Sequence, residues 1–193
     1  YLGDVAPHVK IIPVEYDESA CLKAAFEANQ RVVLPSVGLF ADGTAVAQIG
    51  EKPFEVIQLQ KSDNSGPIVE RDVVLVNTDE ICTAIKDTYD ECRSIVEPSG
   101  AMALAGIKKY VAEHGLEGKN MVSIVCGANM NFDRLRYIAE RTELGERKEA
   151  IFAVTIPEEK GSFLNFCRAL QGRNITEFNY RASDASAAQV FVG

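Results

Sequence analysis

The sequence lacks the features that mark membrane, nucleic-acid-binding and zinc-binding proteins. No apolar run approaches the roughly 18 residues of a membrane-spanning helix, which excludes a spanning segment. Basic residues number 20 against 28 acidic ones and form no cluster, so a net charge of -8 makes nucleic acid and anionic membranes poor partners. Only two histidines are present and the five cysteines form no CxxC pair, which argues against a structural zinc site.

What is present indicates a globular chain from a reducing compartment. Its 193 residues, 47% hydrophobic and 25% charged, suffice for one large domain or two small ones with a sizeable core. The odd, scattered cysteines predict mostly buried thiols rather than a disulfide framework. The chain opens at Tyr1 without Met, and neither a signal peptide nor a transit segment is recognisable. We therefore expect a part of a longer protein.

The first 140 residues alternate between strand-like and helix-like segments. Asn77 and Glu80 form a capping-box pattern, and Pro98 suits the first turn of a helix that His114 and Gly115 end. A polar stretch over 61–67 predicts a surface connector. Strands are expected over 9–15, 72–76 and 121–125, and helices over 19–29, 51–60, 78–92, 98–114 and 131–140. This order is typical of an open α/β sheet covered by helices on both faces.

The pattern changes after a charged run at 146–149. We expect one domain over 1–142 and a second, truncated one over 143–193. A strand over 150–156 is followed by a helix that Ser162 caps, with apolar residues at helical spacing. Two further strands, 175–181 and 187–192, flank an Asp-Ala-Ser turn. This β-α-β-β order is the first part of a ferredoxin-like unit, and it stops before the second helix.

Candidate ligand-binding residues follow from these positions, because ligands bind beyond the carboxyl ends of strands in open α/β sheets. The segment from Cys126 to Asn129 follows a predicted buried strand, and Glu97 precedes a buried helix. Asp42 lies in an Ala-Asp-Gly turn. Each has a plainer interpretation: a structural cysteine at a tight turn, a carboxylate favoured by the helix dipole, and a turn residue.

An acidic cluster could serve a cation. Glu15, Asp17 and Glu18 could surround a hard metal ion, although a solvated acidic turn is the favoured interpretation. His8 and His114 have no partner that the sequence identifies, and we assign neither a catalytic role. Gly161 lets the backbone approach a small ligand at a helix start, or it is a simple turn glycine.

Four segments together resemble the biosynthetic threonine dehydratases. They run in the family's order over nearly the whole chain: Gly38 to Val46, Ile95 to Gly106, Cys126 to Phe132, and Thr155 to Phe163. The resemblance implies a pyridoxal-phosphate enzyme of the tryptophan-synthase-β fold (fold type II), followed by part of a ferredoxin-like, ACT-type regulatory unit.

The same resemblance implies an activity and its partners. Such enzymes convert L-threonine, and also L-serine, by loss of water and ammonia, with 2-oxobutanoate as the product from threonine. They belong to isoleucine biosynthesis, are inhibited by isoleucine and assemble as homotetramers. Their location is cytoplasmic in bacteria and plastid in plants or algae.

The resemblance also assigns residues to the cofactor site. Cys126 matches the Ser/Cys that faces the cofactor's pyridine nitrogen, where a thiol or hydroxyl suits β-elimination better than a carboxylate. The residues that match motif positions lining or supporting the site are Asp42, Gly43, Glu97, Gly127 and Asn129.

Departures from the family pattern limit these expectations. The lysine that binds the cofactor covalently and the glycine-rich phosphate loop lie upstream in the family, so we expect this chain alone to be inactive. In the related serine racemases a metal-binding aspartate stands where this chain has Cys21, which argues against a metal site. The alternatives are a serine racemase or catabolic serine/threonine dehydratase, and a non-catalytic amino-acid sensor.

An effector site is expected in the second domain. A branched aliphatic amino acid needs an apolar wall and a few polar groups for its ammonium and carboxylate. Tyr180 offers a ring and a hydroxyl on an alternating strand, so we expect it, with Gly161, beside the effector. The alternative is a core tyrosine packed on Phe163 and Phe166.

Overall fold

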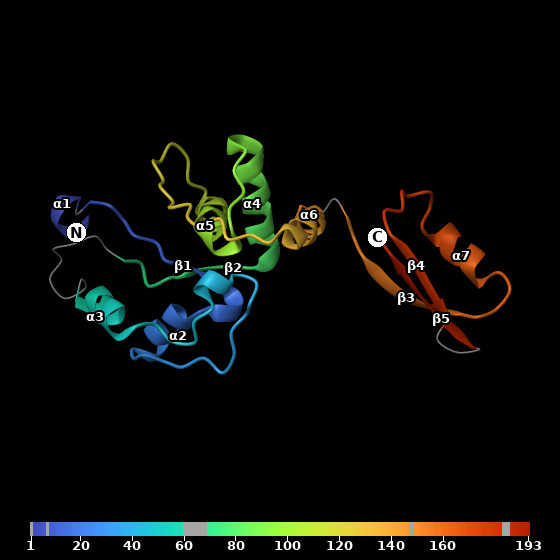
Figure 1. Cartoon of the computed structure of the whole chain (residues 1–193), viewed down its shortest axis with the longest axis horizontal. Coiled ribbons are helices and arrows are strands. Elements are labelled where there is room, and N and C mark those ends of the chain that lie inside the picture. The colour runs from blue at the N-terminus through green and yellow to red at the C-terminus, as the bar shows by residue number, and fades with distance from the viewer. Residues whose placement is uncertain (1, 7, 60–68, 147–148, 183–185) are drawn as a thin grey trace. The chain divides into compact units, whose positions relative to one another are not determined.

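The computed structural model describes residues 2–6, 8–59, 69–146, 149–182 and 186–193. The chain divides into two compact units, Tyr1–Gly145 and Glu146–Gly193. Figure 1 shows that the first unit is mainly helical around two short strands, whereas the second carries a small sheet with one helix. The boundary predicted between residues 142 and 143 falls inside the last helix of the first unit, α6 (Phe132–Gly145).

The first unit is built on two parallel strands, β1 (Val14–Tyr16) and β2 (Val74–Val76). They pair in the register Val14↔Val74, and an isolated bridge joins Ile11 to Val69 upstream. Both predicted strands exist but are shorter than expected, since regular pairing begins only after Pro13. Proline donates no ladder hydrogen bond, and here its carbonyl accepts one from the Val74 amide at 2.9 Å.

Helices surround this pair where the sequence predicts them, except that α1 (Leu2–Val5) was not expected and α6 continues to Gly145. The predicted capping box is confirmed: the Asn77 side chain accepts from the Glu80 amide and the Glu80 carboxylate accepts from the Asn77 amide. Gly115, at φ 58°, ends the helix that Pro98 starts. The α-helices of this unit are α1 (Leu2–Val5), α2 (Cys21–Ala28), α3 (Glu51–Leu59), α4 (Thr78–Cys92), α5 (Pro98–His114) and α6 (Phe132–Gly145).

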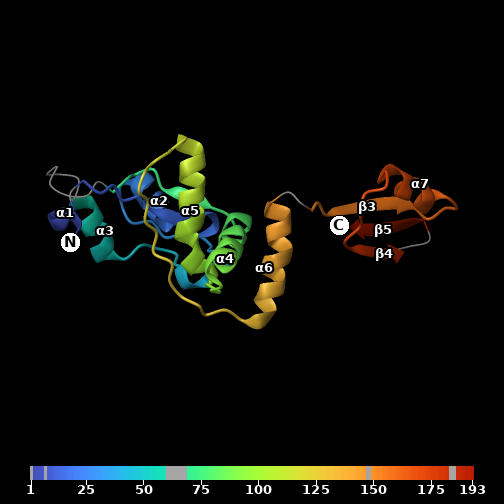
Figure 2. The ribbon, with the colours of Figure 1, turned by 90° about the horizontal axis from the view of Figure 1, so that it is seen from above.

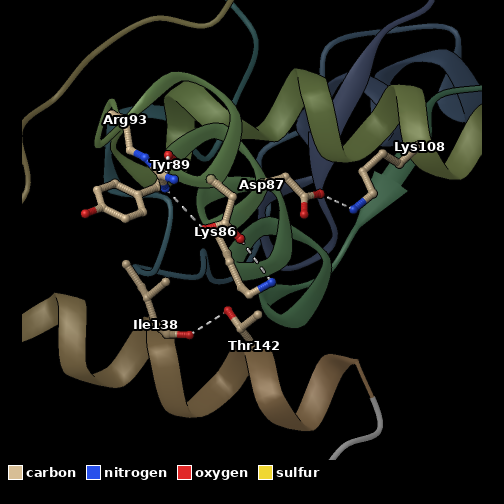
Figure 3. Close-up of polar contacts among 8 residues, drawn as sticks. Lys86, Asp87, Tyr89, Arg93, Lys108, Ile138 and Thr142 are labelled. Carbon is tan, nitrogen blue, oxygen red and sulfur yellow. Dashed lines mark hydrogen bonds and ion pairs between the residues drawn. The ribbon is translucent and has the colours of Figure 1, made fainter.

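The core lies where α5 meets the two strands. Gly106 lets α5 approach β1 closely, because an added Cβ would lie 2.3 Å from a Val14 methyl. Helix α4 packs on α5 and α6 packs on α4 (Figure 2). Ile138 and Thr142 are the buried residues of α6, and both face α4 (Figure 3). One hydrophobic cluster therefore ties the strands to all three helices.

The predicted buried strand over 121–125 is wrong in this structure. The segment has no regular secondary structure, and Val122 and Ile124 are 90% and 78% exposed. Its backbone makes no hydrogen bond to the backbone of another described residue. A strand needs neighbours to satisfy its amides and to cover its faces, and the described part of this chain supplies neither here.

The second unit contains an antiparallel sheet in the order β3-β5-β4 with one helix. Its elements are β3 (Phe152–Pro157), α7 (Ser162–Ala169), β4 (Phe178–Ala182) and β5 (Ala187–Val192). The third strand inserts between the first two, as in a ferredoxin-like unit. Ile156 and Val190 are buried on the face that Phe166 of α7 partly covers.

One predicted helix cap differs in the structure, and two predicted turns fall partly or wholly outside the described residues. Gly161, at φ 97°, is the N-cap of α7, so the predicted cap at Ser162 is wrong by one residue. A positive φ favours glycine, which explains the shift. Asp184 and Ala185 of the predicted Asp-Ala-Ser turn, and the whole connector over 61–67, lie outside the described residues.

The thiols also differ in part from the prediction. Cys21 and Cys82 are buried and Cys167 is half-buried, whereas Cys92 and Cys126 are exposed. No described helix is long and apolar enough to cross a membrane.

Candidate functional site

Two segments that the sequence singled out are joined by hydrogen bonds around Glu97. The Glu97 amide donates to the Gly127 carbonyl at 3.1 Å, and the Asn129 amide donates to the Glu97 carboxylate, also at 3.1 Å. Glu97 therefore holds the turn after Cys126 through its backbone and its side chain at once. Its plainer interpretation as a helix-start carboxylate does not account for this second role.

Three glycines let the segments come this close. An added Cβ would lie 2.9 Å from the Ser99 hydroxyl at Gly43, 1.5 Å from the Cys126 carbonyl oxygen at Gly100, and 2.1 Å from the Glu97 carboxylate at Gly127. Gly127 also has a φ of 75°. The structure thus brings together all six cofactor-site residues predicted from sequence: Asp42, Gly43, Glu97, Cys126, Gly127 and Asn129.

Ser99 is the residue that the sequence analysis missed. Its hydroxyl oxygen is buried and has no hydrogen-bond partner among the described residues. A buried polar group without a partner is costly, so its presence beside Gly43 points to a ligand that supplies the partner. Ser99 lies between Pro98 and Gly100 in the segment that carried the resemblance, but only the folded structure shows that its hydroxyl lacks a partner.

Asp42 lies at the edge of this site. Its carboxylate accepts from the Gly43 amide at 3.2 Å and pairs with Arg134 of α6, whose guanidinium nitrogen lies 3.5 Å away. The neighbouring Ala41 is completely buried. Asp42 is therefore an exposed turn residue anchored by a buried neighbour and a basic partner.

The arrangement fits a flat, polar cofactor such as pyridoxal phosphate. The glycines let these segments pack closely, and the buried Ser99 hydroxyl beside Gly43 has no hydrogen-bond partner among the described residues. The Cys126 side chain is exposed and offers a weak donor or acceptor to a ring nitrogen. The residues present fit the ring side of such a group.

Glu15, in β1, and the two acidic residues that follow the strand are the candidate cation ligands from the sequence. Both carboxylate oxygens of Glu15 accept backbone hydrogen bonds, from Leu22 at 2.8 Å and Lys23 at 2.9 Å. Burial raises the pKa of the Glu15 carboxyl, and these two amides partly oppose that effect. The expectation of a solvated turn is therefore wrong for Glu15, which caps α2, although Asp17 and Glu18 are exposed. Within the described residues no three metal-ligating side chains gather.

The predicted effector residues lie in the second unit. The Tyr180 hydroxyl donates to the Glu158 carboxylate, and the Phe163 ring meets the Tyr180 ring edge-on at 6.1 Å. That hydrogen bond and the Glu158 charge raise the pKa of Tyr180. Tyr180 is 40% exposed, so it packs on Phe163 without being a core residue. Around Gly161, an added Cβ would meet nothing within 4 Å.

Comparison with known proteins places the chain in a family. A family described as pyridoxal-phosphate dependent enzymes matches residues 1–127, which is more than half of the chain. The chain belongs to this family. Residues 140–193 match a second description, the C-terminal regulatory domain of threonine dehydratase.

Curated relatives cover the whole sequence. The L-threonine dehydratase biosynthetic IlvA of Salmonella typhimurium is 52% identical over 100% of the chain, and the mitochondrial threonine dehydratase of Schizosaccharomyces pombe is 48% identical over 99%. The chain spans only 36% and 31% of these relatives. The match thus covers about a third of each relative's length.

A solved structure shares the fold. The processed form of threonine deaminase isoform 2 from Solanum lycopersicum superposes with a TM-score of 0.65 at 39% identity, covering 72% of this chain and 38% of that one. The α/β fold of pyridoxal-phosphate enzymes, followed by a regulatory unit, is confirmed.

Proposed function

We propose that the full-length protein containing this chain converts L-threonine to 2-oxobutanoate and ammonia with pyridoxal phosphate, under feedback control by isoleucine. The observation that carries the proposal is the convergence of Gly43, Glu97 and the turn after Cys126 around an unpartnered Ser99 hydroxyl. The identity to biosynthetic threonine dehydratases along the entire chain supports the choice of substrate.

The residues of this chain would hold the cofactor's ring and orient it. Bound pyridoxal phosphate supplies an electron sink for negative charge on the substrate. Cys126 would place a thiol, and not a carboxylate, at the pyridine nitrogen. The site then lacks the negative charge with which a carboxylate would favour protonation of the ring. Glu97 would fix the position of this thiol, because it holds the following turn at Gly127 and Asn129.

The glycines would set how closely the segments around the cofactor pack together. Gly43, Gly100 and Gly127 each stand where a methyl group would collide with the site's own atoms. Ser99 would donate to, or accept from, the bound group. The lysine that attaches the cofactor is expected from the remainder of the protein, so the proposal concerns the complete enzyme.

The second unit would bind the regulatory amino acid. Phe163 offers an apolar wall beside Tyr180, and Glu158 offers a carboxylate that suits an ammonium group. Gly161 leaves open space at the start of α7. The family resemblance implies a homotetramer, and we include this assembly in the proposal for the full-length protein.

The test is an assay of the purified full-length protein with pyridoxal phosphate. We expect 2-oxobutanoate from L-threonine, a slower reaction with L-serine, and inhibition by isoleucine. D-serine as the main product from L-serine would favour the racemase alternative. Binding of isoleucine without turnover of either substrate would favour the sensor.

A further inference from the structure

Helix α6 contacts a loop of the candidate site, residues 39–43. Arg134, in its first turn, reaches this loop twice: one guanidinium nitrogen lies 3.5 Å from the Asp42 carboxylate and the other donates to the Leu39 carbonyl at 3.4 Å. These two acceptors are three residues apart. A forked guanidinium can hold both, whereas a lysine ammonium is a single point of attachment.

One turn farther along the helix, an aromatic contact holds the same loop. The Tyr137 ring lies 5.8 Å from the Phe40 ring, and Phe40 in turn lies 6.5 Å from Tyr16 at the end of β1. Phe40 is partly buried against the main core cluster. The loop is therefore clamped between α6 on one side and the end of a core strand on the other.

The clamped loop ends in the candidate site itself. Gly43 follows Asp42 directly, donates its amide to the Asp42 carboxylate, and stands against the unpartnered Ser99 hydroxyl. A displacement of the loop would move Gly43 relative to the Ser99 hydroxyl. The hydrogen bonds between Glu97 and the turn after Cys126 do not involve this loop.

Helix α6 is itself anchored to α4 and not to the loop alone. Ile138 and Thr142 are buried against α4 (Figure 3), and Arg141 pairs with Asp79 at 2.7 Å. The helix therefore has a fixed seat from which Arg134 and Tyr137 can hold the loop.

We propose that Arg134 and Tyr137 are positioning residues that hold the 39–43 loop at the cofactor site, although neither touches the cofactor. The proposal rests on the proposed function for the nature of the ligand. The clamp itself rests only on the contacts of α6 with the loop.

The test compares variants of the full-length protein by hydrogen exchange over residues 38–45, measured with and without pyridoxal phosphate. Arg134→Gln should accelerate exchange in this segment by about fivefold, the size expected from losing a hydrogen bond and an exposed ion pair. Tyr137→Leu should accelerate exchange in the same segment. Arg134→Lys should restore part of the protection, because it keeps the charge near Asp42 but loses the fork.

Arg136→Gln is the matched control. Arg136 lies on the same helix, its side chain is 87% exposed, and it pairs with Glu140 one turn on. Exchange over 38–45 should match the unmodified protein in this variant. The affinity for pyridoxal phosphate, followed by its fluorescence, should fall several-fold in Arg134→Gln and stay constant in Arg136→Gln.

Unchanged exchange over 38–45 in both Arg134→Gln and Tyr137→Leu would overturn the clamp, whatever the activity. Equal acceleration in Arg136→Gln would also overturn it, since the effect would then be a general loosening of α6. A full-length protein that shows the exchange pattern but no threonine turnover would refute the proposed function and leave the clamp standing.

Discussion

Replacing Gly127 by alanine should disturb the cofactor site through a collision that the structure defines. Gly127 has a φ of 75°, and its new methyl carbon would lie 2.1 Å from a Glu97 carboxylate oxygen and 2.9 Å from the Glu97 Cγ. The Glu97 side chain must move away. Its movement removes the acceptor of the Asn129 amide, so the turn after Cys126 loses one of its two attachments.

The magnitude follows from two contributions. An alanine in the left-handed region costs about 1 kcal/mol, and the loss of a hydrogen bond to a charged acceptor costs about 1.5 kcal/mol at a half-exposed position. The exposed turn relaxes when no cofactor is bound, so binding must restore its geometry. The sum of about 2.5 kcal/mol then appears in the affinity, as a roughly 50-fold weaker binding of pyridoxal phosphate.

Gly118→Ala provides the matched control. Gly118 has a φ of 62°, and an added Cβ there would meet nothing within 4 Å. It carries the same backbone cost without the collision, and it lies outside the site. The assay is a fluorescence titration of the full-length protein with pyridoxal phosphate, and equal affinity losses in the two variants would refute the reasoning.

Three further outcomes are expected. Burial raises the pKa of Cys82 to about 12, so its alkylation by iodoacetamide at pH 8 should lag far behind that of the exposed Cys92, as read by peptide mass mapping; comparable labelling would mean that the α4 core opens readily. Asn77→Ala should lower the free energy of unfolding by about 1 kcal/mol in urea titrations, whereas Asn77→Asp, which keeps an acceptor, should not. Glu158→Gln should lower the pKa of Tyr180, because the acceptor loses its charge; an absorbance titration that gives the same phenol pKa in both proteins would contradict the hydrogen bond.

Local chemistry made the helices of the first unit predictable. Asn77 and Glu80 specify a helix start by satisfying each other's amides, and Gly115 specifies an end through its positive φ. Such signals are complete within a few residues. They need no partner from elsewhere in the chain.

The prediction of a strand over 121–125 was wrong because strand formation depends on distant parts of the chain. Its run of apolar residues is strand-like, yet whether Val122 and Ile124 become buried depends on neighbours that a sequence window does not contain. The interpretation of Glu15 as part of a solvated turn was wrong for a similar reason. Its role as a cap of α2 depends on a turn that brings the Leu22 and Lys23 amides onto its carboxylate.

The candidate site was found through motif resemblance, and only the fold explains it. Nothing in the spacing of Gly43, Glu97 and Cys126 indicates that they meet, because 54 residues separate the first two and 29 the last two. Ser99 and Arg134 are two residues whose importance the sequence does not reveal. A hydroxyl without a partner and an arginine with two distant acceptors become visible only when the chain is folded.

The exposed apolar segment over 121–125 also affects the tendency of this chain to associate with itself. The amides and carbonyls of this apolar run make no backbone hydrogen bond to another described residue, so a second chain can add a strand to it. Val122 and Ile124 would then bury their side chains between copies, so the 193-residue chain produced by itself should associate increasingly as its concentration rises. Val122→Lys would oppose this strand pairing, and the solubility of the chain should rise.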